Sequence, residues 1–267
     1  MPVLFFVATM VLYLVGTGFF LVYLLRRSEA LSKVSLAVAG IGFLTHTAAL
    51  ISRMAVVGHV PVASFPEAMS FFSWGLVLVL LIVEFRYRVP VLGSFILPLA
   101  SISLISAAAL PQEAPALEPV LKTVWIHVTL SMLGTVGFAV AFVAGLMYVI
   151  QERLLKSKRF NVLYAKLPPL DFLDQLNQQS IVIGFPFLTL GIIAGAISAE
   201  FTRGSYLSWN PEQAWALVTW VFYFVVLTGR LTVGWRAKRA AYLTIIGFVG
   251  VVLTFVGIVL KGHASVA

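Results

Sequence analysis

Eight long, predominantly apolar stretches constrain this chain more than any other feature of its sequence. A helix needs about 20 apolar residues to cross the hydrocarbon core of a bilayer. In hydrocarbon every backbone amide and carbonyl must be paired within the protein, which leaves only helices or a closed barrel. The stretches are continuous, unlike the alternating segments of roughly 10 residues that form barrel strands. They run over about 3–25, 34–57, 69–86, 90–110, 123–150, 181–199, 213–229 and 240–260.

Composition favours the same interpretation. Hydrophobic residues make up 61% of the 267 residues and charged residues only 10%. Lipid must be the solvent for most of such a surface. We therefore predict an all-α, polytopic integral membrane helical bundle of about eight transmembrane helices, forming a single domain over residues 1–267. The first stretch lacks a basic leader and a small-residue cleavage site, so we expect a retained helix and not a signal peptide.

The distribution of basic residues predicts the orientation. Most of the 18 Lys and Arg residues lie in the first, third, fifth and seventh connections. The positive-inside rule places these connections in the cytoplasm, so both termini face outward. The net charge of +8 then reflects topology and does not indicate a nucleic-acid partner. The residues concerned are Arg26, Arg27, Lys33, Arg86, Arg88, Arg153, Lys156, Lys158, Arg159, Lys166, Arg230, Arg236, Lys238 and Arg239.

Segment 169–179 in the fifth connection is amphipathic. Leu170, Phe172, Leu173 and Leu176 are spaced to form one apolar face. We expect a short helix lying at the membrane surface. No soluble-enzyme motif and no clean Gly-x-x-x-Gly pair of the dimerising kind is identified.

The four histidines are candidates for function because ionisable residues at membrane depth are costly. His46 is expected near the middle of the second span, whereas His59, His127 and His263 are expected at the outer face. His46 is more simply a hydrogen-bonded packing residue, and His59 a turn residue. His127 and His263 are either ligands or ordinary interfacial histidines.

Tryptophans gather in the outer loop at about 200–220. Trp209, Trp215 and Trp220 could present flat apolar faces at the membrane boundary. Two outer histidines beside such a platform would suit haem, whose iron accepts two axial imidazoles. Arg203 would then be available to the propionates. The alternative interpretation treats the tryptophans as interfacial anchors.

Several motifs resemble the cytochrome c assembly proteins of the CcsA/ResC type, which carry a tryptophan-rich "WWD" loop. The resemblance extends from about residue 40 to the end. The related HemX-like membrane proteins share this scaffold. The motifs are Gly58-His59-Val60-Pro61, Trp125-Ile126-His127-Val128, Leu173-Asp174-Gln175-Leu176-Asn177, Gly184-Phe185-Pro186, Ser208-Trp209-Asn210-Pro211, Gly234-Trp235-Arg236 and His263.

The resemblance implies a haem-handling role in cytochrome c maturation. His127 and His263 would ligate haem b, presented by Trp209, Trp215, Trp220 and Asn210. It also implies a ResB/CcsB-like membrane partner, delivery to apocytochrome c, and a place in the bacterial cytoplasmic (inner) membrane. No catalytic residue is implied, although the chain would fit as a subunit of a holocytochrome c synthase.

Two departures from the family pattern matter. The acidic residue of the WWD core is Asn210 here, and the family's membrane-embedded histidine is Thr228. These departures favour the HemX-like alternative, whose members are associated with tetrapyrrole synthesis and with glutamyl-tRNA reductase levels. An unrelated transporter or scaffold is the third hypothesis.

Overall fold

The chain forms a bundle of long helices. The structure, a computed structural model, describes residues 2–26, 28–109, 121–158, 162–206 and 211–264. Eight of the helices in this part are long and apolar enough to cross a membrane, which confirms the predicted fold class. In order, the elements are α1 (Pro2–Leu25), α2 (Glu29–Val57), α3 (Phe65–Tyr87), the 3-10 turn η1 (Pro90–Leu92), α4 (Gly93–Ala109), α5 (Leu121–Lys156), α6 (Val162–Lys166), α7 (Leu170–Arg203), α8 (Pro211–Leu231) and α9 (Ala237–Ala264).

Local sequence signals set several helix ends. Ser28 and Ser64 are N-caps whose side chains accept hydrogen bonds from backbone amides in the first turns of α2 and α3. Gly58 and Gly204 end α2 and α7 in the left-handed conformation, with φ of 79° and 66°. A residue without a Cβ adopts that conformation at little cost.

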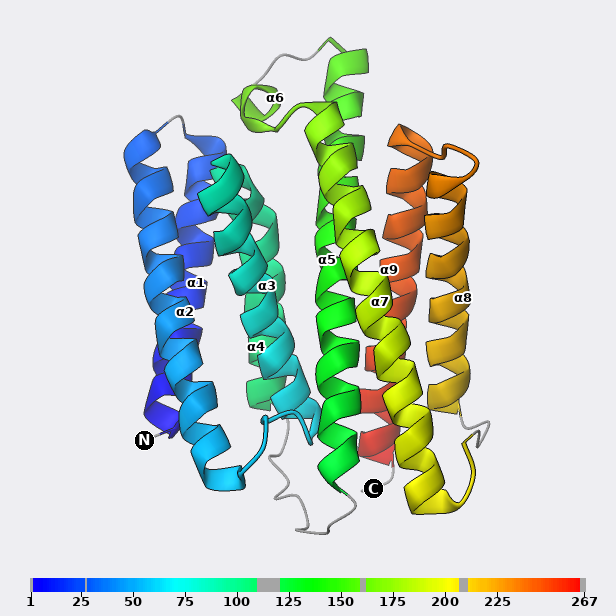
Figure 1. The fold of residues 1–267 in the computed structure, drawn as a ribbon. Helices are drawn as coiled ribbons and strands as arrows, with labels where there is room; N and C mark the ends of the chain where they lie inside the picture. Colours follow the sequence, from blue (N-terminus) through cyan, green and yellow to red (C-terminus); the bar gives the residue numbers. More distant parts are fainter. Residues whose placement is uncertain (1, 27, 110–120, 159–161, 207–210, 265–267) are drawn as a thin grey trace.

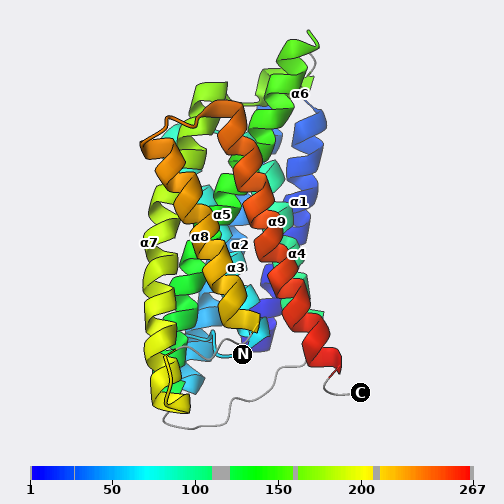
Figure 2. The ribbon, with the colours of Figure 1, turned by 90° about the vertical axis from the view of Figure 1, so that its right-hand side faces the viewer.

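The bundle has two halves that meet at α3 and α5. Figure 1 shows α1–α4 on one side and α5, α7, α8 and α9 on the other. Figure 2 shows the second half from the side on which α8 and α9 lie. Gly75 of α3 allows the halves to approach closely, because a Cβ there would lie 2.8 Å from a methyl carbon of Val136 on α5. The two halves therefore share one continuous core.

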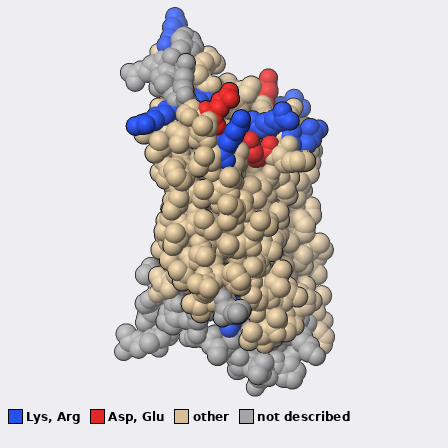
Figure 3. Space-filling model, turned by 90° about the vertical axis from the view of Figure 1, so that its left-hand side faces the viewer, with Lys and Arg blue, Asp and Glu red and all other residues tan. Residues whose placement is uncertain are grey.

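The two ends of the bundle differ in charge. Both ends of the chain lie at the same end of the bundle (Figure 1). On the face drawn in Figure 3, charged side chains gather at the other end, where α6 lies. This separation agrees with the expected alternation of connections. That the basic end is cytoplasmic remains a prediction from the positive-inside rule.

The prediction of a surface helix over residues 169–179 was wrong. This segment forms the first turns of α7, which continues through the bundle to Arg203. Leu173 and Leu176 are buried, and the Asn177 amide donates to the Ala141 carbonyl of α5 at 2.6 Å. The apolar face is the one that packs against neighbouring helices. Spacing alone does not distinguish such a face from one that contacts lipid.

Candidate functional site

His127 lies in the second turn of α5, held in a slot on α7. Its Nδ1 is 2.6 Å from the Gly191 carbonyl oxygen. A carbonyl only accepts hydrogen bonds, so Nδ1 is the donor, and in the neutral ring the lone pair is on Nε2. This tautomer is the one that binds a metal through Nε2, with a carbonyl orienting the ring from behind.

Two glycines of α7 make room for this slot. A Cβ at Gly195 would lie 2.6 Å from His127 Nδ1, and a Cβ at Gly191 would lie 2.4 Å from the Ser131 hydroxyl of α5. Gly195 therefore makes room for the imidazole, and Gly191 lets α5 approach α7 closely at Ser131. The prediction that the chain has no clean Gly-x-x-x-Gly pair was wrong, because Gly191 and Gly195 form one. The spacing of Gly191 and Gly195 is the signal that predicts close helix packing.

His263 lies in the last turn of α9, which ends at Ala264. This turn is at the same end of the bundle as the start of α5 (Figure 1). The side chain of His263 lies outside the described residues, as does that of Arg203. Trp209 and Asn210 lie outside them entirely. Ligation by His263 and the roles of Trp209 and Asn210 therefore remain predictions.

The two described tryptophans of the predicted platform differ in their surroundings. Trp215, near the start of α8, is 53% exposed. Trp220 lies further along α8, where its indole N–H donates to the Thr189 hydroxyl of α7 at 2.9 Å. Its ring stacks on Phe224 with centroids 5.3 Å apart. Trp220 thus packs α8 against α7, and its contribution to a platform remains a prediction.

The other two histidines have structural partners. His46 is fully buried in α2. Its ring nitrogens lie 3.2 Å from the Tyr13 hydroxyl and 3.0 Å from the Ser70 hydroxyl. His59 follows the left-handed Gly58, and its Nδ1 lies 2.9 Å from the Val60 carbonyl oxygen. His46 is therefore a packing residue, as the simpler interpretation held, and His59 stabilises a turn.

Arg230 is a buried residue that the sequence analysis had placed in a connection, and that placement was wrong. It lies in α8, and its side chain is 0% exposed. One guanidinium nitrogen is 2.6 Å from a carboxylate oxygen of Asp174, and the other is 2.6 Å from the Asn177 side-chain oxygen. The same Asp174 oxygen accepts from the Ala237 amide at 3.1 Å.

This network explains why α7 has an acid at Asp174 and an amide three residues later at Asn177. Asp174 and Asn177 lie on one helix face and together satisfy one guanidinium. Asn177 also donates to the Thr244 hydroxyl of α9 at 2.9 Å. The network joins α7, α8 and α9 at the basic end of the bundle, far along α7 from the His127 slot.

Comparison with known families assigns the chain to one of them. The model of the family described as "Cytochrome C assembly protein" matches residues 62–263, which include the His127 slot, Arg230 and the position of His263. The chain belongs to the cytochrome c assembly protein family.

Relatives and a solved structure agree with this assignment. The chain is similar to the cytochrome c biogenesis protein CcsA of Guillardia theta, with 31% identity over 80% of this chain and 78% of that protein. It is 32% identical to CcsA of Prochlorococcus marinus strain NATL1A, over 81% and 78% of the two chains. The fold is similar to that of the cytochrome c haem lyase CcmF, with a TM-score of 0.66 and 17% identity. The alignment covers 98% of this chain and 49% of CcmF, so this chain spans about half of that structure.

The chain is therefore a multi-pass membrane protein of cytochrome c assembly. The comparisons favour this function over the HemX-like alternative, which the departures at Asn210 and Thr228 had suggested. Two substituted positions weigh less than a match that extends over most of the chain.

Proposed function

We propose that this protein binds haem b at the end of the bundle that holds His127 and presents it for attachment to apocytochrome c. His127 and His263 would be the axial ligands, and Trp209, Trp215, Trp220 and Asn210 would contact the ring. Haem is the bound substrate here. The protein orients it, while the iron and the thiols of the client supply the chemistry.

The observation that carries this proposal is the hydrogen bond between His127 Nδ1 and the Gly191 carbonyl. In the neutral ring this hydrogen bond leaves the lone pair on Nε2, the atom that would bind iron. Gly195 supports this proposal as well, because it leaves room for the His127 ring on α7. The half-exposed Trp215 at the same end adds an aromatic surface that is suited to a porphyrin.

Membership in the family also supports a proposal for the partners of this activity. We propose a ResB/CcsB-like membrane protein as the partner and the bacterial cytoplasmic membrane as the location. Membership in the family supports an apocytochrome c as the client. The name of the structural neighbour, a haem lyase, is consistent with a role in haem attachment.

The test measures haem in the purified protein. Wild-type protein in detergent should contain haem b in a pyridine haemochrome assay, and His127→Gly should lose most of it. Added imidazole should restore the absorption spectrum of His127→Gly, because it supplies the missing ligand without the side chain. His46→Ala should retain haem in whatever fraction of the protein folds.

A second variant tests the slot without removing a ligand. Gly195→Ala should lower haem content several-fold, because its Cβ would lie 2.6 Å from His127 Nδ1. Gly250→Ala is the matched control, since a Cβ at that position meets no heavy atom within 4 Å. Equal haem content in wild type, His127→Gly and Gly195→Ala would disprove the ligand assignment. Co-purifying proteins from the same preparation would identify the partner.

A further inference from the structure

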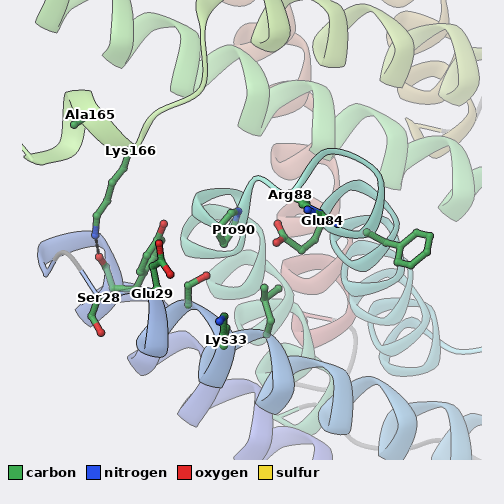
Figure 4. Close-up of a pocket in the computed structure, with 12 residues that line it drawn as sticks. Ser28, Glu29, Lys33, Glu84, Arg88, Pro90, Ala165 and Lys166 are labelled. Carbon is green, nitrogen blue, oxygen red and sulfur yellow. Dashed lines mark hydrogen bonds between the residues drawn. The ribbon is translucent and has the colours of Figure 1, made fainter.

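A large cavity lies at the basic end of the bundle, away from the proposed haem site. It has a volume of about 1210 Å³, and its walls come from α1, α2, α3, η1 and α6 (Figure 4). This volume is enough for a ligand of the size that protein pockets commonly hold. Charged side chains of both signs line it, namely Glu29, Lys33, Glu84, Arg88 and Lys166.

Four of these charges, Glu29, Lys33, Glu84 and Arg88, form no salt bridge among the described residues. Glu29 and Lys33 are four residues apart, as are Glu84 and Arg88, a spacing at which ion pairs commonly form on helices. Neither pair forms a salt bridge in the part of the chain that the structure describes. Arg88 follows the end of α3 in the left-handed conformation, with φ of 54°. The cavity therefore retains the capacity to bind both a cation and an anion.

Glu84 provides the clearest sign of a missing ligand. Its Oε2 is buried and has no hydrogen-bond partner. A buried carboxylate oxygen without a donor is costly, because it has lost its hydrogen bonds to water and gained no hydrogen bond in exchange. A donor that enters the cavity would remove this cost.

Lys166 is already engaged and holds one wall in place. Its ammonium donates to the backbone carbonyls of Tyr23 and Arg26 at the end of α1. It also lies 4.0 Å from the centroid of the Tyr23 ring. These contacts attach α6 beside the cavity and leave Lys33 and Arg88 as the cations available to a ligand.

The position of the cavity indicates a ligand with an apolar tail. Charged side chains mark this end of the bundle (Figure 3), where lipid headgroups are expected. Phe85 lines the cavity and is 92% exposed. On a membrane helix, such a side chain faces acyl chains. The cavity thus combines charged walls with an apolar, lipid-facing edge.

We propose that this cavity binds the headgroup of one phospholipid that carries a primary ammonium and a phosphate diester, the phosphatidylethanolamine class. The ammonium donates to Glu84, and the phosphate lies by Lys33 and Arg88. The acyl chains run along Phe85. This site is separate from the proposed haem site.

The test measures which lipid stays with the protein. Purified protein is exchanged into micelles that contain equal amounts of phosphatidylethanolamine, phosphatidylcholine and phosphatidylglycerol with identical acyl chains, and retained lipids are counted by native mass spectrometry. Phosphatidylethanolamine should be retained preferentially, because phosphatidylcholine has no ammonium N–H and phosphatidylglycerol has no ammonium. Glu84→Gln and Lys33→Gln should each reduce this retention by about tenfold or more, as expected for the loss of a charge-assisted hydrogen bond.

The control is Glu152→Gln, which removes a carboxylate of α5 that lies outside the cavity and pairs with Lys156. It should retain lipid like wild type. Equal retention of the three lipids by wild type, or unchanged retention in Glu84→Gln, would overturn the proposal. Displacement of the lipid by millimolar phosphoethanolamine would also overturn it, in favour of a soluble ligand. Haem content should be unchanged in Glu84→Gln, which separates this result from the proposed function.

Discussion

Removal of the Asp174 carboxylate should destabilise the second half of the bundle strongly. In Asp174→Ala, the guanidinium of Arg230 loses its only carboxylate partner among the described residues, at 2.6 Å, and the Ala237 amide loses its acceptor. The Arg230 side chain is 0% exposed, so water cannot replace the lost carboxylate without a rearrangement. Breaking a buried pair on one side typically costs about 3–5 kcal/mol.

A value within this range is expected, because the Arg230 side chain is fully buried although the Asp174 side chain is 19% exposed. Arg230 Nε already has no hydrogen-bond partner, so the guanidinium has little further compensation. Asn177 and the Asp174 carbonyl would still accept from it, which keeps the cost finite. The assay is equilibrium unfolding in mixed micelles as the mole fraction of sodium dodecyl sulfate rises, followed by circular dichroism.

The control for this experiment is Glu152→Ala. The Glu152–Lys156 pair has the same oxygen–nitrogen distance, 2.6 Å, but the Lys156 side chain is 65% exposed. Its removal should change stability little, because exposed pairs are screened by water. The double variant Asp174→Leu/Arg230→Met should recover much of the loss, since it leaves no buried charge. If Asp174→Ala were no less stable than Glu152→Ala, the network would not hold these helices together.

Two further predictions concern buried or partly buried residues with packing contacts, one of which, Trp220, also belongs to the haem proposal. His46→Leu should lower the free energy of unfolding by about 1–3 kcal/mol, because it leaves the buried hydroxyls of Tyr13 and Ser70 without their ring partner. The same unfolding titration measures this loss. A variant as stable as wild type would contradict the prediction. Trp220→Phe should cost about 1 kcal/mol through loss of the hydrogen bond to Thr189 while the aromatic stack is kept. A loss of haem beyond the loss of stability in Trp220→Phe would support the proposed contact with the porphyrin.

Hydropathy alone is sufficient to predict that this protein is embedded in a lipid bilayer and that its fold is a helical bundle. Continuous apolar stretches leave no other way to satisfy the backbone, so eight helices can be predicted from the order of residues alone. The position of His127 near the start of a helix could also be predicted from the sequence. The same holds for the role of His46 as a packing residue. These features are local, because they depend on hydropathy and on residues near one another in the chain.

Which polar residues meet, in contrast, depends on how the helices cross. Asp174 and Arg230 are 56 residues apart, and the sequence analysis assigned one to a surface helix and the other to a connection. An amphipathic pattern records that a face is apolar but not whether a helix or lipid covers it. The tautomer of His127 likewise depends on a carbonyl 64 residues away, which two glycines bring within reach. Such pairings are a property of the whole bundle, because no short stretch of the chain contains both partners.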